Sequence, residues 1–102
     1  VSFGDNEFKK ELIEIFMEQI PVFISNMKKF YADGDLTNLG KEAHTAKSSV
    51  LIFGMTNAGN SLKEIQHQSE NKEVEQLQNL IESVVLELNI AEKELQIIQS
   101  QI

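Results

Sequence analysis

The chain has 102 residues, a formal net charge of −7, and neither cysteine nor arginine. This length predicts a single domain, residues 1–102, and the lack of cysteine excludes disulfides and thiolate-bound metal and fits a cytoplasmic location. The acidic balance argues against nucleic acid as a partner and against contact with anionic membrane surfaces.

The first half of the chain predicts two helices and no strand, because apolar residues recur at three- and four-residue spacing. The first helix should follow Asp5, a good N-cap, and run to about residue 19. Pro21 should end this helix or kink it into a second one, residues 21–32, since proline is tolerated in a first helical turn. The expected buried stripe of the first helix consists of Phe8, Leu12, Ile15, Phe16 and Ile20.

Three further helices are predicted after residue 32. Asp35 should cap a helix over residues 36–53 that Gly54 ends. Thr56 or Asn57 should cap the next helix, which reaches about residue 67 before a polar break at 68–72. The last helix, of about 29 residues or roughly 43 Å, should be the longest. These helices predict an all-α fold, an antiparallel four-helix bundle with the first helix packed as a lid across one end.

His44 is the candidate reactive residue of the helix over residues 36–53. It lies beside the apolar stripe rather than within it, so its imidazole should be exposed. Lys47 and Ser48, three and four positions later, share its face of the helix. A neutral imidazole nitrogen can attack phosphorus without a general base, and an ammonium can stabilise phosphoryl oxygens. Taken singly, these residue types are common on helix surfaces.

The stretch Ala43-His44-Thr45-Ala46-Lys47-Ser48-Ser49, followed by Phe53-Gly54-Met55, resembles the signature of histidine-containing phosphotransfer (HPt) domains. The resemblance covers about residues 5–70. It implies a helical bundle in which His44 accepts a phosphoryl group from an aspartate of a response-regulator receiver domain and passes it to another receiver. It also implies that Lys47 stabilises the phosphoryl oxygens and that Gln66, twenty-two residues after His44, orients the ring.

The same resemblance implies limits on the activity. The domain would have no kinase or nucleotide-hydrolysing activity and no cofactor of its own, because the Mg²⁺ belongs to the partner receiver domain. Ser48 stands where the family usually has glycine, and Ala46 where it commonly has leucine; we expect transfer to survive, more slowly, beside Ser48. The chain begins with Val1 rather than methionine, which favours a domain excised from a longer protein such as a hybrid sensor kinase.

A receiver-binding surface is expected on the same side of the domain. Exposed apolar residues rimmed by polar groups are typical of binding sites. The proposed surface consists of Ile13, Met17, Lys41, Leu51 and Ile52. The alternative is that the apolar members of this set belong to a wide core stripe.

The sequence carries weaker signals for two other functions. Glu64 and His67 have the Glu-x-x-His spacing of di-iron bundles, which need this motif twice. The motif occurs only once here, because the equivalent position three residues before His44 is Lys41, which would repel a cation. No metal site is therefore predicted. The regular stripe of the last helix would also suit a dimerisation or interaction module, including an HPt-like domain with an inactive site.

Overall fold

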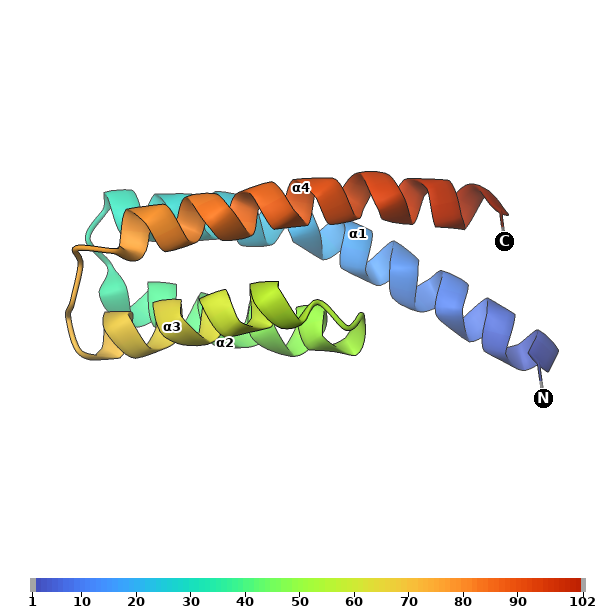
Figure 1. The fold of residues 1–102 in the computed structure, drawn as a ribbon, viewed down its shortest axis with the longest axis horizontal. Coiled ribbons are helices and arrows are strands. Elements are labelled where there is room, and N and C mark those ends of the chain that lie inside the picture. Colours follow the sequence, from blue (N-terminus) through green and yellow to red (C-terminus); the bar gives the residue numbers. More distant parts are fainter. Residues whose placement is uncertain (1, 102) are drawn as a thin grey trace.

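The computed structural model describes the backbone of residues 2–101 and the side chains of residues 7–101. Four helices make up this part of the chain: α1 (Ser2–Ala32), α2 (Leu36–Ile52), α3 (Thr56–Glu70) and α4 (Leu77–Gln101). Consecutive helices pack against each other and α1 packs against α4, which closes an antiparallel bundle (Figure 1). The predicted all-α four-helix architecture is therefore confirmed. None of the described helices combines the length and the hydrophobicity needed to cross a membrane.

The predicted break at Pro21 is wrong, because α1 continues through the proline as one helix of 31 residues. A proline inside a helix costs about 3 kcal/mol, since it removes one backbone hydrogen bond and crowds the preceding turn. Ile20 and Phe23 flank the proline and are both buried. Burying one such side chain contributes about 1.5–3 kcal/mol, so the continuous apolar stripe outweighs the local penalty. Pro21 itself is exposed.

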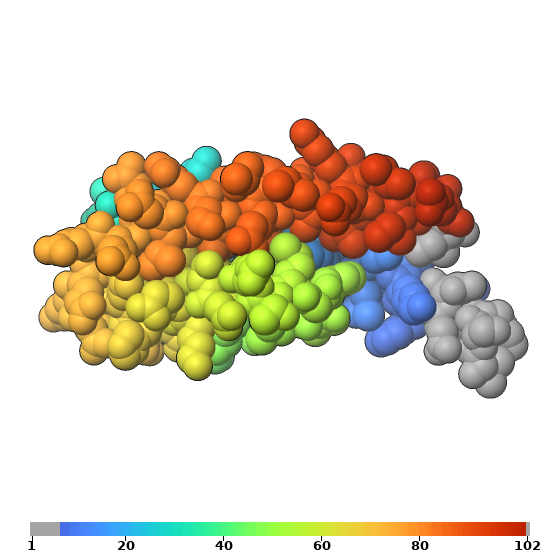
Figure 2. Space-filling view, viewed as in Figure 1, coloured from blue at the N-terminus to red at the C-terminus, as the bar shows by residue number. Residues whose placement is uncertain are grey.

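The lid predicted as a separate helix is the N-terminal half of α1. This half and the C-terminal half of α4 extend beyond the ends of α2 and α3 (Figures 1 and 2). Phe16 of α1 stacks on Phe53, the C-cap of α2, with ring centroids 4.6 Å apart. The end of the α2–α3 pair is thus covered without a fifth helix. At 25 residues, α4 is also shorter than predicted and is not the longest helix.

The core stripe of α1 differs from the predicted one. Phe16 and Ile20 are buried as expected, but Phe8 and Ile15 are exposed, and Ile13 is buried in their place. The helix therefore turns a face centred between Phe16 and Ile20 towards the bundle. The buried hydrophobic residues of α1 are Ile13, Phe16, Ile20, Phe23 and Met27.

The ends of α3 also differ from the prediction. Met55 is the N-cap and makes no side-chain cap hydrogen bond, so neither Thr56 nor Asn57 caps the helix. The helix continues through Gln68 and Ser69, which are buried rather than part of a polar break. By contrast, α2 begins as predicted after Asp35, whose side chain accepts a hydrogen bond from the amide of Asn38.

Three helices end in the same backbone motif. In the turns after α1, α2 and α3, the amide two positions beyond the C-cap bonds to a carbonyl five residues back. The residue between them needs a positive φ, which suits glycine. Gly34 and Gly54 fill this position after α1 and α2, but Lys72, with φ of 58°, fills it after α3.

Lys72→Gly should therefore raise the free energy of unfolding by about 1 kcal/mol, because it removes the contact between Cβ and the carbonyl that disfavours positive φ. Urea denaturation followed by circular dichroism would measure this. Lys72→Ala is the matched control, since it removes the ammonium but keeps the Cβ. An equal gain in both variants would contradict the conformational explanation.

Candidate functional site

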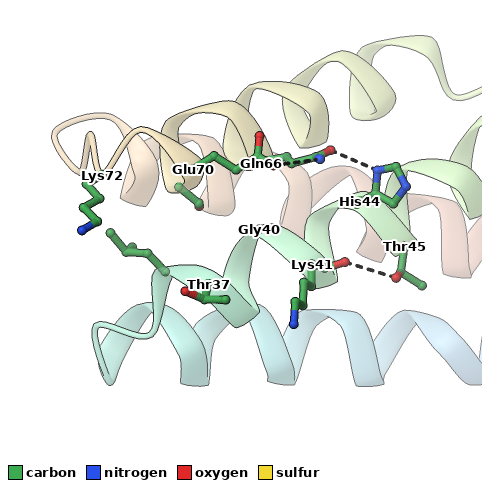
Figure 3. A pocket seen from close by; sticks show the side chains of 10 residues that line it. Thr37, Gly40, Lys41, His44, Thr45, Gln66, Glu70 and Lys72 are labelled. Carbon is green, nitrogen blue, oxygen red and sulfur yellow. Dashed lines mark hydrogen bonds between the residues drawn. The ribbon is translucent and has the colours of Figure 1, made fainter.

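His44 and Gln66 meet across the α2–α3 interface. The Nδ1 atom of His44 lies 3.1 Å from Oε1 of Gln66 (Figure 3). His44 is exposed on α2, whereas Gln66 is half-buried on α3. The structure thus brings together the two side chains that the sequence resemblance paired, with the ring open to solvent.

This contact determines which ring nitrogen carries the proton. An amide oxygen can only accept a hydrogen bond, so Nδ1 of a neutral His44 ring must donate. The lone pair is then on Nε2. The amide nitrogen of Gln66 points the other way and donates to Oε2 of Glu70 at 3.4 Å. The arrangement presents Nε2 as the nucleophilic atom of the ring.

Small residues allow α2 and α3 to approach each other beside His44. Gly40, one turn before His44, is buried, and a Cβ at this position would lie 3.5 Å from Cβ of Ser69. Ser69 is 3% exposed, and its hydroxyl has no hydrogen-bond partner. This close packing holds the two backbones so that a glutamine on α3 can reach a histidine on α2.

A pocket of about 550 Å³ adjoins the ring (Figure 3). Two lysines, Lys41 and Lys72, and one carboxylate, Glu70, supply its charged groups. Thr45, also in its wall, donates from its hydroxyl to the backbone carbonyl of Lys41 at 3.1 Å. Since the two lysines outnumber the one carboxylate, the lining of this pocket carries a net positive charge, which favours an anionic group.

Lys47 and Ser48 do not line this pocket. Lys47 is half-buried and lies seven residues after Gly40, which places it on the side of α2 that faces α3. The hydroxyl of Ser48 donates to the backbone carbonyl of His44 at 3.4 Å. Its proton is therefore directed to the helix backbone rather than to the ring.

The expected receiver-binding residues divide into two groups. Lys41, Leu51 and Ile52 on α2 are exposed, with Ile52 66% exposed. Ile13 was predicted at the surface but is only 5% exposed and belongs to the core. Including Ile13 in this surface was therefore wrong, because the helix face is rotated from the predicted one.

Met17 is half-buried and lies on a different side of α1 from the predicted surface. Met17, Ile24 and Tyr31 follow each other at seven-residue spacing, so they share one side of the helix. Tyr31 lines a pocket with Ile81 and Val85 of α4. This side of α1 therefore faces α4 rather than α2.

Two exposed residues of α1 were missed by the sequence analysis. Ile15 and Val22, seven residues apart, are each about half exposed. The neighbouring Gln19 accepts a hydrogen bond from Ser49 of α2, which places this side of α1 next to α2. The sequence of α1 has more apolar residues than one helix face can bury, and this excess could have predicted that some of them are exposed.

Within the part of the chain that the structure describes, no group of three or more histidine, aspartate or glutamate side chains comes together as a metal-binding cluster. Glu64 instead accepts a hydrogen bond from Gln68, and the ring of His67 lies beside Asn71. Neither residue of the Glu-x-x-His spacing therefore faces a second ligand set.

Comparison with known proteins agrees with this geometry. The model of the Hpt domain family matches residues 11–96. The chain belongs to the Hpt domain family. A curated relative, the phosphorelay intermediate protein YPD1 of Candida albicans, is 26% identical over 89 residues, or 82% of this chain. This Hpt domain spans about half, 48%, of the length of that relative. No solved structure matches it significantly.

Replacing Gln66 by alanine should redistribute the ring proton of His44, because Nδ1 then loses its acceptor. We expect the fraction of the tautomer protonated at Nε2 to rise severalfold, since that tautomer is the more common form of an unconstrained ring and one hydrogen bond contributes about 1 kcal/mol. Long-range ¹H–¹⁵N correlation spectra of the histidine rings measure this. The ring of His67 is the internal control, and an unchanged His44 pattern would show that Gln66 does not fix the tautomer.

Proposed function

We propose that this domain is an intermediate of a multistep phosphorelay, in which His44 receives a phosphoryl group from a receiver-domain aspartate and passes it to another receiver. The observation that supports this most strongly is the pairing of an exposed His44 with Gln66, which leaves Nε2 unprotonated. Membership of the Hpt domain family and the similarity to a phosphorelay intermediate protein point to the same role.

The transfer step needs no base from this chain. The lone pair of Nε2 attacks the phosphorus of the aspartyl phosphate, the N–P bond forms, and the P–O bond to the aspartate breaks. The aspartate leaves as a carboxylate, and the proton on Nδ1 stays in place. Positive charge develops on the ring, and Oε1 of Gln66 stabilises it by accepting the Nδ1 hydrogen bond. The reverse step, towards another receiver, uses the same groups.

Cations near the ring would offset the charge of the phosphoryl group. Lys47, which shares the helix face of His44, is proposed to contact the phosphoryl oxygens in the complex, as the family resemblance implies. Lys41, in the pocket wall, adds positive charge to the approach path. Because charge stabilisation dominates phosphoryl transfer, we propose that the Mg²⁺ of the receiver supplies the remaining positive charge.

A cytoplasmic location and a hybrid sensor kinase as the parent protein remain predictions.

The receiver is proposed to dock on the exposed side of α2. Leu51 and Ile52 provide its apolar part, and Ile15 and Val22 of α1 extend it. Leu51 and Ile52 follow His44 by seven and eight residues, so this apolar contact lies about two helical turns from His44 on α2. A dimerisation or interaction module with an inactive site is the alternative, and the labelling experiment below separates the two.

Transfer of ³²P from an aspartyl-phosphorylated receiver domain should label the wild-type domain and not the His44→Gln variant. The variant keeps a polar side chain of similar reach but removes the nucleophilic nitrogen. His67→Gln is the matched control, because it removes the other histidine of the chain and should leave labelling unchanged. Labelling of His44→Gln, or no labelling of the wild-type domain by any of several receivers, would overturn the proposal.

Ile52→Glu should weaken receiver binding about tenfold or more, since it places a charge in an apolar contact. Titration of the domain with a receiver by isothermal calorimetry measures the Kd. The control is Leu86→Glu on α4, which makes the same change at a residue of similar exposure, 62% against 66%. If both variants lose affinity equally, the receiver does not dock on α2 specifically.

A further inference from the structure

The carboxylate of Glu70 has no role in the transfer step described so far. It lies one turn after Gln66 on α3, and its Oε2 accepts from the amide nitrogen of Gln66 at 3.4 Å. It also lines the pocket beside His44 (Figure 3). Glu70 is exposed, so the bundle does not need it for packing.

We infer that Glu70 is a positioning residue that sets the orientation of the Gln66 amide and, through it, the tautomer of His44. This inference rests on the proposed function, since a fixed tautomer matters only if Nε2 is the nucleophile. It concerns the chain of contacts from Glu70 through Gln66 to His44.

The argument begins with the ambiguity of a glutamine side chain. An amide presents an acceptor oxygen on one side and a donor NH₂ on the other, and the two orientations have nearly the same shape. If Gln66 were reversed, its NH₂ would donate to Nδ1. The ring would then carry its proton on Nε2, and the nucleophilic lone pair would be lost.

Glu70 removes this ambiguity because an ionised carboxylate only accepts hydrogen bonds. Its oxygen attracts the NH₂ group and repels the amide oxygen, so Oε1 is directed towards Nδ1 of His44. The observed distances, 3.4 Å from Glu70 to Gln66 and 3.1 Å from Gln66 to His44, correspond to this orientation. The same negative charge also favours the positive charge that develops on the ring during attack.

Three substitutions of Glu70 change the hydrogen-bonding character of this position step by step. Glu70→Gln keeps an acceptor oxygen within reach, Glu70→Ala removes it, and Glu70→Lys replaces it with an ammonium that can only donate. The ammonium would attract the amide oxygen of Gln66 and favour the reversed orientation. The three variants should therefore form a graded series in the tautomer of His44.

Long-range ¹H–¹⁵N spectra, recorded at a pH that keeps the rings neutral, provide the first readout. We expect the Nδ1-protonated pattern of His44 to persist in Glu70→Gln, to weaken in Glu70→Ala and to weaken most in Glu70→Lys. Transfer from a phosphorylated receiver should slow about fivefold in Glu70→Lys, the scale expected when one exposed charged contact is lost and an opposing one is introduced.

The matched control is Glu82→Lys on α4. Glu82 accepts from Gln78 at 3.4 Å, the same separation and spacing as Glu70 and Gln66, but away from His44. This variant should leave both the tautomer and the rate unchanged, and circular dichroism should show that all variants are folded.

An unchanged His44 pattern in Glu70→Lys, a Glu70→Gln variant as impaired as Glu70→Ala, or an equal slowing in Glu82→Lys would overturn the inference. The spectra do not depend on any receiver. Failure of the wild-type domain to accept phosphate would therefore count against the proposed function, while the tautomer series would still test Glu70.

Discussion

The hydrogen bond between Nδ1 of His44 and Oε1 of Gln66 depends on how closely α2 and α3 approach. A glutamine side chain has a limited reach, so the two helices must lie close together at this level of the bundle. Gly40 and Ser69 meet one turn away and provide that closeness. The turn between the helices, with Gly54 in the left-handed conformation, sets the register along their length. The site is therefore a property of the helix pair rather than of either helix.

The sequence predicted α2 well and α1 poorly, for a reason that lies in their patterns. Asp35 and Gly54 are strong start and stop signals, and small buried residues such as Ala43 and Ala46 mark one face of α2 only. The N-terminal half of α1 instead has five apolar residues within six positions, from Leu12 to Met17. Several stripes fit such a segment, and only packing against the other helices decides between them. The break at Pro21 was predicted wrongly because the burial that outweighs the proline penalty, at Ile20 and Phe23, is a tertiary effect.

The sequence also predicted the candidate site only in part. His44 and Gln66 were paired through the family resemblance, and their contact could not be obtained from spacing because it joins two helices. The buried positions of Gln68 and Ser69 were missed because polarity was taken as a sign of exposure. The contact of Glu70 was missed because a carboxylate one turn from a glutamine is common, and it acquires meaning only when the amide orientation is known.

The exposure of the His44 ring has a consequence for the lifetime of any phosphoryl group that it carries. A group on Nε2 would project into water, because the ring is exposed and none of the described residues forms a lid over it. Solvent is therefore not excluded from the N–P bond. The same openness lets a large partner reach the phosphorus without any rearrangement of the bundle. If His44 carries the phosphoryl group as proposed, water and the partner protein therefore approach it from the same open side of the ring.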